Sequence, residues 1–550
     1  MVGKSSRLTD LVTTSGRREH YVSAGLWDTE TLSAAVARGA RDYPDWIAVV
    51  DLEGTRRVTY QELDEAASRV AAFLSASGVN PGDVVAVQMP NWYETVAIYV
   101  GVLRAGAILN PLIPSYEANE LGHMLDVGGA VAIITPDEYR SHDFGRRMEE
   151  VSKALGRAVR HIRIPNPHDG QPALAQFPAS TGVTQAVPRD ASEISELLFT
   201  SGTEARPKAV LHSEQTTSSG IRQNARHLGL DENIVVWMPS PLGHSTGLNY
   251  GVRLALQLGG RLVLQDRWDP EAAVRICASE KPSYTSVSTT FLTDMLAVLG
   301  RAPEDLSSLR YFTCAGAAIP ATVVSEAAKY GMTVLRGYGS SETLTVSKIV
   351  PDDEWDLRVR TEGRPLNHVE VELRDAAGNT VPPGVPGEVF VRGPATCLGF
   401  ARDPERTAAT FSAEGWVRTG DLATLDLEGY LTIVGRTKEI IIRGGMNIAP
   451  AEIEALLRTN SRIADVVVVG LPDARLGELV CACIVAADQE PPSFDEIVAD
   501  LRGKRLATHK LPQRVEYFTS LPRTSTGKVR RPDLVAQIAL RDREGAQRDA

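Results

Sequence analysis

Apolar and polar residues alternate along the first third of the chain in a helix–strand rhythm. Residues 59–78 have the apolar spacing of a helix that ends at Gly78, and residues 83–90 form an apolar run typical of a buried strand. A second helical stretch at 92–106 and a second apolar run at 130–136 follow. Such a βαβ order predicts a parallel sheet whose two faces are covered by helices.

The same rhythm returns after a stretch rich in Pro, Gly and polar residues at about 163–192, which predicts a long surface excursion. Apolar runs at 233–243, 259–266 and 309–318 are expected to be further strands of this kind. From about Glu362 the pattern changes to short segments in which apolar and polar residues alternate, separated by Gly and Pro. This pattern is typical of antiparallel strands.

After Arg436 the pattern predicts a compact α+β tail. Helical spacing at 452–459 and 494–505 alternates with strand-like runs at 463–470, 478–487 and 514–522, and the last dozen charged residues are expected to fray. We therefore predict two domains, a large one at 1–437 and a small one at 438–550.

Composition narrows the class of protein. With 550 residues, 43% hydrophobic and 23% charged, the chain is long enough for more than one core. A net charge of −11 argues against a nucleic-acid partner. The most apolar segment is interrupted by Glu94, Arg104 and Pro111, which disfavours an integral membrane span. Neither a signal peptide nor a disulfide framework is evident, and the five cysteines indicate a reducing, cytoplasmic location. Cys481 and Cys483 are read as strand packing rather than as metal ligands.

The segment at 197–212, LLFTSGTEARPKAVLH, has the chemistry of a phosphate-binding loop. An apolar run leads into small and hydroxylated residues, and Lys208 follows closely. No Gly precedes Lys208 and Ala209 follows it, so the segment does not match the Walker pattern. Backbone N–H groups, hydroxyls and one cation remain the natural ligands of a polyphosphate.

Further motifs carry groups that suit a nucleotide. RGYGSSET at 336–343 offers the aromatic face of Tyr338 for a purine and the Glu342 carboxylate for Mg²⁺. WVRTGDL at 416–422 places Asp421 in a predicted turn, where a carboxylate could accept both ribose hydroxyls. Arg436 follows a predicted strand, and LPRTSTGKVRR at 521–531 sets Lys528 on a Gly-containing loop.

With these motifs in this order, the chain resembles the adenylate-forming superfamily, most closely its acyl-CoA synthetases, over nearly its whole length. The resemblance implies an α/β fold. Its large N-terminal domain would hold stacked parallel-type α/β sheets and a small β-barrel-like subdomain, and a small mobile α+β C-terminal domain would follow. It also implies an ATP-dependent, AMP-forming ligase that converts a hydrophobic carboxylic acid to an acyl-adenylate, releases pyrophosphate and transfers the acyl group to CoA.

The resemblance assigns roles residue by residue. Lys528, Glu342 and His244 are the expected catalytic residues, and Thr200 and Glu342 the expected Mg²⁺ ligands. Asp421 and Arg436 would hold the ribose, adenine would lie between residues 316–318 and Tyr338, and Ser341 would donate to the α-phosphate. The expected ATP- and AMP-binding residues are Thr200, Ser201, Gly202, Thr203, Lys208, Gly316, Ala317, Ala318, Gly337, Tyr338, Gly339, Ser340, Ser341, Asp421, Arg436 and Lys528.

For the thioester step the resemblance implies rotation of the small domain about a hinge at Lys438. Gly444 and Gly445 would then line the path of CoA together with His244. His244 is expected to titrate near neutrality and to act as a gate.

The phosphate loop departs from the family pattern. Glu204 replaces a hydroxyl residue, and Ala205 and Ala209 replace glycines. A carboxylate beside a triphosphate is repulsive and lost glycines restrict positive φ, so we expect slower or weaker ATP capture.

Several alternatives stay open on the sequence alone. An acyl carrier protein could replace CoA as acceptor, although the interval of about 80 residues between Glu342 and Asp421 leaves no evident room for the rotation-blocking insertion of carrier-loading relatives. An amino-acid adenylation domain lacks support because no acidic residue stands out near His244, and nothing favours a luciferase-like oxygenase. A non-catalytic nucleotide-binding relative would have been free to lose Lys528.

Overall fold

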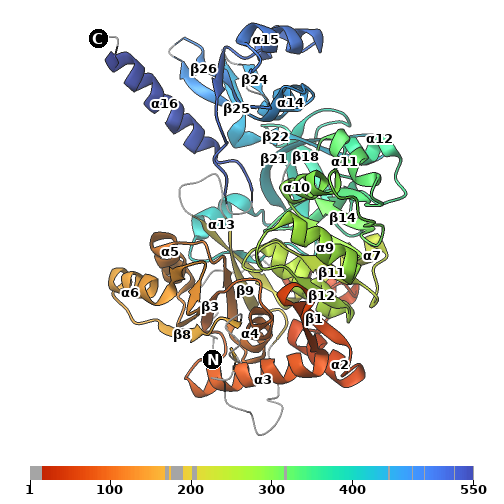
Figure 1. Ribbon diagram of the computed structural model, residues 1–550, viewed down its shortest axis with the longest axis vertical. Coiled ribbons are helices and arrows are strands. Elements are labelled where there is room, and N and C mark those ends of the chain that lie inside the picture. Colours follow the sequence, from red (N-terminus) through yellow and green to blue (C-terminus); the bar gives the residue numbers. More distant parts are fainter. Residues whose placement is uncertain are drawn as a thin grey trace.

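The computed structural model contains two unequal parts, a large body and a smaller C-terminal part (Figure 1). It describes residues 15–167, 173–174, 177, 187, 190–200, 207–314, 319–443, 446–473, 475–487, 490–524 and 527–548. The excursion predicted at 163–192 falls largely outside these residues.

The first sheet of the large body is mainly parallel and ends in antiparallel strands at both edges. In spatial order its strands are β17 (Arg364–Pro365), β16 (Leu344–Lys348), β15 (Val334–Ser340), β14 (Tyr311–Cys314), β13 (Tyr284–Val287), β11 (Val235–Met238), β12 (Arg261–Leu264), β1 (Ile47–Asp51) and β2 (Arg56–Thr59). The helical segments of this half are η2 (Leu52–Gly54), α7 (Glu214–Leu228), η4 (Thr246–Arg253), α8 (Leu254–Leu258), α9 (Pro270–Glu280), α10 (Thr289–Leu299), α11 (Ala321–Ala328) and α12 (Trp355–Arg360).

The second sheet carries the N-terminal βαβ units and the strands that flank the phosphate loop. Its order is β20 (Gly399–Phe400), β10 (Lys208–Ser213), β9 (Ile194–Thr200), β4 (Ile108–Leu112), β3 (Val84–Gln88), β5 (Ala132–Pro136) and β8 (Arg160–Ile164). The elements around it are α1 (Ser15–Ser23), α2 (Leu32–Asp42), α3 (Tyr60–Ala76), α4 (Tyr93–Arg104), α5 (Ala118–Gly128), α6 (Phe144–Leu155), α13 (Pro404–Thr410) and the hairpin β6 (Glu138–Tyr139) and β7 (His142–Asp143).

Helices α3 and α4 pack against each other in the core shared by both sheets. The capping box of Thr59 and Glu62 starts α3, and α4 is buried along its whole length. A Cβ atom at Gly101 would lie 2.5 Å from Cβ of Val70, so only glycine allows this close approach. In Figure 1 the second sheet lies on the left with α5 and α6, and the first lies on the right with α9 and α10.

Beyond the two stacked sheets lies an antiparallel sheet with its own small core, and a mixed sheet forms the C-terminal part. The antiparallel sheet holds β18 (Glu370–Arg374), β19 (Gly387–Arg392), β21 (Val417–Leu425) and β22 (Leu431–Arg436). The C-terminal sheet holds β24 (Met446–Ile448), β23 (Ile441–Arg443), β26 (Gly477–Ala486), β25 (Ile463–Asp473) and β27 (Arg514–Tyr517). Its helical segments are α14 (Pro450–Leu457), α15 (Phe494–Gly503), η6 (Thr508–Lys510) and α16 (Arg531–Arg548).

This arrangement confirms the predicted α/β class with a large N-terminal and a small α+β C-terminal part. The exact boundary between residues 437 and 438 stays a prediction; the intervening η5 (Thr437–Glu439) contains Lys438. The charged end of the chain, for which the sequence predicts fraying, is part of α16 as far as Arg548. Its inner face buries Leu534 and Ile538 against β25, and the same small core contains Cys481 and Cys483. Within the described ranges, no helix is both long and apolar enough to cross a bilayer.

Candidate active site

Asp421 and Arg436 are cross-strand partners on β21 and β22. Arg436 Nε donates to Asp421 Oδ1 at 2.6 Å, and the Tyr338 hydroxyl donates to Asp421 Oδ2 at 2.6 Å. Asp421 therefore lies within a strand and not in the predicted turn. Asp421 is 6% exposed, and its carboxylate is held by one residue from each of two sheets, which fixes an acceptor beside an aromatic ring.

The ring of Tyr338 stays a protonated phenol. Burial, followed by the charge of Asp421, raises the pKa of Tyr338 well above its ordinary value. Gly339 next to it approaches the carbonyl of Leu344 so closely that a Cβ atom would clash. The predicted pairing of an aromatic ring with side-chain-free backbone is thus built into the hairpin of β15 and β16.

Glu342 lies in the turn between β15 and β16, and its carboxylate forms an ion pair with the ammonium group of Lys208 on β10. Lys208 is also the strand partner of Thr200, the last residue of β9. The Thr200 hydroxyl is buried and has no hydrogen-bond partner among the described residues. A carboxylate, a cation and a spare hydroxyl thus gather where the phosphate loop leaves β9 and rejoins β10.

The electrostatics of this cluster keep Glu342 ionised. Burial alone would raise the pKa of Glu342, but the charge and hydrogen bond of Lys208, with the Ser340 hydroxyl, lower it below its ordinary value. A carboxylate oxygen and a hydroxyl oxygen are ligands that Mg²⁺ accepts. The residues present therefore fit the metal that the resemblance implies.

His212 supports the same turn and was not identified from the sequence. Its Nε2 donates to the carbonyl oxygen of Ser341 at 2.7 Å, and its Nδ1 lies 3.0 Å from Thr216 Oγ1. Burial lowers the pKa of His212 to about 4, so the ring is neutral at physiological pH. Lys208 and His212 are four residues apart on one strand and share a face, a spacing that could have suggested a paired role.

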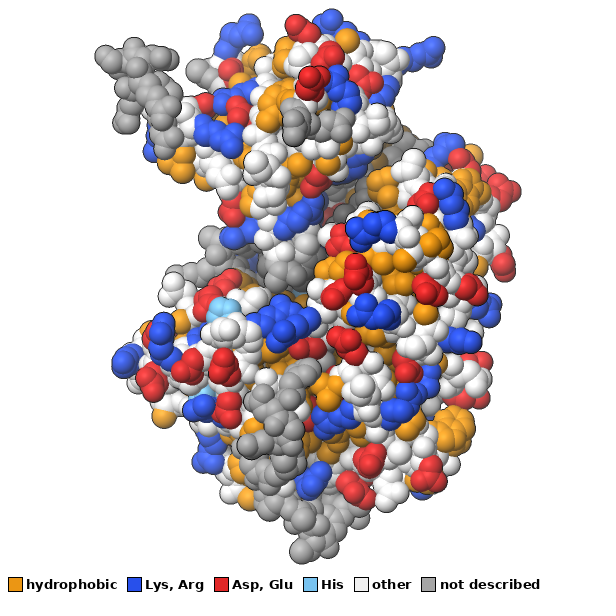
Figure 2. Space-filling model, in the orientation of Figure 1, with side chains coloured by type: hydrophobic (Ala, Val, Ile, Leu, Met, Phe, Trp, Pro, Cys, Tyr) orange, Lys and Arg blue, Asp and Glu red, His pale blue; other side chains and the backbone are white. Residues whose placement is uncertain are grey.

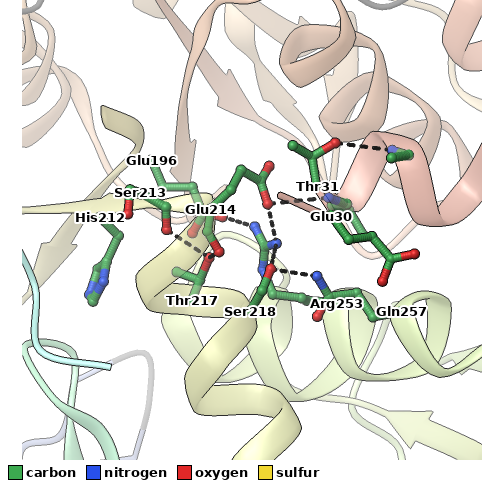
Figure 3. A network of polar contacts seen from close by, with 12 residues as sticks. Glu30, Thr31, Glu196, His212, Ser213, Glu214, Thr217, Ser218, Arg253 and Gln257 are labelled. Atoms are coloured by element: carbon green, nitrogen blue, oxygen red, sulfur yellow. Dashed lines mark hydrogen bonds and ion pairs between the residues drawn. The ribbon is translucent and has the colours of Figure 1, made fainter. Parts of the chain in front are cut away.

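A buried ion network joins β9, α7 and η4 (Figure 3). Arg253, the last residue of η4, points between Glu196 on β9 and Glu214 at the start of α7 and pairs with both carboxylates. Ser218 and Gln257 extend the network, and Glu214 also accepts from the backbone N–H of Leu32. Removing one partner would leave a buried charge uncompensated, so the network fixes β9, α7 and η4 to one another.

Lys528 reaches this region from the C-terminal part. Burial, followed by the nearby Arg436, lowers its pKa, while Asp421 and Glu342 act in the opposite direction. The side chain keeps exposed surface, so it faces the space between the two parts and not a packed core. Figure 2 shows the molecule narrowed between them. The preceding Gly527 lies against Ser288 and Thr290 of the large body; a Cβ atom there would be 3.4 and 3.5 Å from their hydroxyl oxygens.

His244 lies on the same side of the site. Burial, and then repulsion from Lys528, lowers the pKa of His244 to about 4. The expectation that His244 titrates near neutrality is therefore wrong for this arrangement, because an enclosed imidazole beside an ammonium group resists protonation. A neutral His244 can still accept or donate a hydrogen bond at the acid.

The structure thus brings Thr200, Lys208, Tyr338, Glu342, Asp421, Arg436 and Lys528 around one region, with His244 beside Lys528. Gly337 and Ser340 lie on β15, and Ser341 precedes Glu342. The remaining predicted site residues, Ser201, Gly202, Thr203, Gly316, Ala317, Ala318, Gly444 and Gly445, lie outside the described residues, as do Glu204 and Ala205.

Replacing Tyr338 by Phe should weaken ATP binding moderately. The ring stays, but the 2.6 Å hydrogen bond that orients Asp421 is lost, which should raise the KM for ATP by about 3- to 10-fold. Initial rates at varied ATP measure the effect. The control is Tyr311→Phe. Tyr311 lies on β14 and forms no hydrogen bond to Asp421, so this variant should leave the KM for ATP unchanged. An unchanged KM in Tyr338→Phe as well would contradict the role of this hydroxyl.

Comparison with known proteins agrees with the geometry. The chain belongs to the AMP-binding enzyme family, whose model matches residues 36–401, and the C-terminal domain of AMP-binding enzymes matches residues 452–528. It is 36% identical over 520 residues to the medium-chain fatty-acid–CoA ligase of Escherichia coli, covering 94% of this chain and 92% of the relative.

A second relative, the 3-[(3aS,4S,7aS)-7a-methyl-1,5-dioxo-octahydro-1H-inden-4-yl]propanoyl:CoA ligase of Mycobacterium tuberculosis, is 32% identical over 523 residues, which is 92% of this chain and 99% of the relative. The crystal structure of ATP-bound MatB from Rhodopseudomonas palustris superposes with a TM-score of 0.83 at 27% identity, covering 92% of this chain and 99% of that one. These findings confirm the prediction of an AMP-forming acyl-CoA ligase of the adenylate-forming superfamily.

Proposed function

We propose that this ligase acts on a hydrophobic carboxylic acid and that the residues of the candidate active site bind ATP, Mg²⁺ and the acid. The acid would be joined to the α-phosphate of ATP with release of pyrophosphate, and the acyl group would then pass to CoA. The observation that carries the proposal is that Lys208, Glu342, Asp421, Arg436 and Lys528, which come from three separate sheets and one loop, meet in one region.

The first half-reaction brings two anions together, a carboxylate and a triphosphate. Charge neutralisation and alignment must therefore supply most of the rate enhancement. Lys208 would neutralise the terminal phosphates that the loop at 200–208 would embrace, and Ser341 would donate to the α-phosphate. Asp421 and Arg436 would hold the ribose, with the adenine against Tyr338.

Glu342 and Thr200 are the residues that would hold Mg²⁺. The metal would supply positive charge to the phosphate oxygens. For its own part the chain holds the side chain and the backbone of Glu342 in place. Lys208 pairs with it, Ser340 Oγ accepts from the Glu342 backbone N–H at 3.2 Å, and the Cys397 backbone N–H donates to the Glu342 carbonyl at 2.8 Å.

Lys528 would bridge the acid carboxylate and the α-phosphate as negative charge shifts between them. Its ammonium group lies close enough to His244, Asp421 and Glu342 for each to affect its protonation or be affected by it. This arrangement is suited to the adenylation step. For thioester formation Lys528 would leave as the small part turns about Lys438, and Gly444, Gly445 and His244 would line the path of CoA.

The acceptor and the location are also proposals. CoA is favoured over an acyl carrier protein, because the interval from Glu342 to Asp421 holds only short strands, turns and the short helices α12 and α13, without an added domain. A cytoplasmic location agrees with the five cysteines, all of which are free and buried. The two relatives act, by their names, on a medium-chain fatty acid and on a propanoate attached to a dioxo-hydrindane, so similarity alone does not choose the acid.

The test is a panel of carboxylic acids with ATP and Mg²⁺, with and without CoA, read by product mass. We expect an acyl-adenylate and pyrophosphate without CoA, and an acyl-CoA and AMP with it. Binding of ATP without turnover of any acid would instead identify a non-catalytic nucleotide-binding protein. An acyl-adenylate that CoA does not consume would favour the carrier protein as acceptor.

A further inference from the structure

Lys348 at the end of β16 is a buried lysine that the steps above do not use. It is 2% exposed, its Nζ donates to Asn224 Oδ1 at 2.6 Å, and it lies 5.7 Å from the centre of the Tyr250 ring. Among the described residues no carboxylate lies within ion-pair distance of it. A buried ammonium group without a counter-ion is costly unless it loses its proton or gains an additional acceptor.

Other buried polar groups around Lys348 also lack partners. Tyr284 on β13 lies near the polar side chains of Asn224, Thr313 and Ser286, which partly offset the rise in its pKa that burial causes. Burial also raises the pKa of Tyr250, and Tyr284 adds to that rise. Although these groups lie near one another, the Tyr284 hydroxyl, Asn224 Nδ2 and Thr313 Oγ1 are buried and form no hydrogen bond of normal geometry in the described part of the chain. Native proteins pair nearly all such atoms with protein, water or ligand. We call Asn224, Tyr250, Tyr284, Thr313 and Lys348 the polar floor.

The residues of the polar floor lie on, or in contact with, elements that also carry residues of the proposed reaction site. Tyr250 is on η4, six residues after His244, and the residue is only half-buried although its neighbours Asn249 and Gly251 are buried. Gly337 is half-buried next to Tyr338, and a Cβ atom on it would lie 3.2 Å from Lys348 Cε. Two residues that keep part of their surface exposed therefore lie in or beside the floor.

Strand β13 indicates how far the polar floor lies from the reacting groups. Ser288, just past its end, lies against Gly527 beside Lys528, and its hydroxyl is buried without a described partner. Tyr284 is four residues earlier along the same strand, so the floor lies about 13 Å from the reacting end. A medium-length or two-ring acid could span that distance.

We propose that the acid accepted by this ligase carries an oxygen acceptor at the end remote from its reacting carboxylate, received by Lys348, Asn224 and Tyr284. The inference rests on the proposed function and names its substrate class: hydrophobic acids with a distal hydroxyl, carbonyl or second carboxylate. Such an oxygen supplies the partner that the floor lacks. An acid with a plain alkyl end leaves the same buried groups unpaired. A site built to hydrogen-bond a substrate oxygen discriminates against an acid that lacks it.

Burial lowers the pKa of Lys348 to about 7. The side chain can therefore adopt either protonation state near neutral pH. In its charged form it suits a second carboxylate, and in either form it can donate to a hydroxyl or carbonyl oxygen. The proposal does not depend on which of the three oxygens is preferred.

The experiment compares decanoate with its terminal-hydroxyl, penultimate-oxo and terminal-carboxylate counterparts. Pyrophosphate release gives kcat/KM for each acid with the full-length enzyme. At least one oxygenated acid should exceed decanoate by about 10- to 100-fold, since hydrogen bonds to a charged or buried group are of that size. Decanoate equal to or better than all three counterparts would overturn the inference while leaving the proposed function intact. No pyrophosphate from any acid would instead remove the proposed function, and this inference with it.

Variants of floor residues test whether the preference for oxygenated acids depends on the polar floor. Lys348→Met should bring the preferred oxygenated acid to within about threefold of decanoate, with decanoate itself changed little, because Met keeps the volume and removes the donor. Tyr284→Phe, which removes only a hydroxyl, is the milder variant should Lys348→Met fold poorly, and it should reduce the preference by about 3- to 10-fold. The matched control is Lys329→Met, because Lys329 is an exposed lysine paired only with Glu326. Equal losses for all four acids in both floor variants would show a purely structural role and contradict the inference.

Discussion

Lys528→Ala should lower the rate of acyl-adenylate formation by about 10²- to 10³-fold, the usual loss when one preorganised charge is removed from a transition state. The residue is on an exposed loop of the C-terminal part, and its ammonium group is near Asp421, Glu342 and His244. Stability should change little, because no described hydrogen bond or ion pair of the Lys528 side chain holds the fold. Pyrophosphate release at saturating acid and ATP measures the effect.

The same variant should convert a supplied acyl-adenylate and CoA to acyl-CoA at nearly the normal rate, since Lys528 would have left the site by then. Lys510→Ala is the control within the C-terminal part. Its partner Glu452 is on the surface, so neither step should change beyond the small effect of a surface ion pair. Equal loss of both steps in Lys528→Ala would contradict the two-arrangement mechanism.

Glu342→Gln should lower kcat/KM for ATP by about 10²- to 10³-fold and raise the Mg²⁺ concentration needed for half-maximal rate. The amide keeps the shape of the side chain and leaves the His212 bond to Ser341 in place, but it removes the charge that Lys208 and the metal share. Titration of Mg²⁺ at fixed ATP measures the shift, and calorimetric binding of Mg²⁺–ATP gives a readout independent of turnover.

Glu326→Gln is the matched control for Glu342→Gln. Glu326 is a surface carboxylate on α11 that pairs with Lys329, so its loss should leave rate and metal dependence unchanged. Normal activity of Glu342→Gln at an unchanged Mg²⁺ requirement would show that this carboxylate does not hold the metal.

The sequence predicts the large elements and the site motifs because both depend on local patterns. Helix spacing, apolar runs and the setting of Lys528 in PRTSTGK can each be seen within a short window. Asp421 shows where a local pattern misleads. Its Gly–Asp pair is typical of a turn, and Gly420 does have a positive φ of 75°, but β21 accommodates it as an irregularity opposite Val389 and continues as a strand.

Groups that act through distant contacts could not be predicted in this way. His212 meets the Ser341 carbonyl across 129 positions of sequence, and Lys348 meets Asn224 across 124. Arg253 joins Glu196 and Glu214 only because η4 packs against β9 and α7. Nor does the sequence indicate that burial and Lys528 keep His244 neutral, since its pKa depends on the packed surroundings.

The central claim is that a hydroxyl-lined loop, an acidic metal ligand and a distant lysine act on one nucleotide to form an acyl-adenylate. Exchange of labelled pyrophosphate into ATP, measured with an accepted acid and without CoA, tests it most directly. The account predicts exchange that requires the acid and Mg²⁺ and is lost in Lys528→Ala. Acid-independent exchange, or release of ADP and orthophosphate in its place, would contradict it.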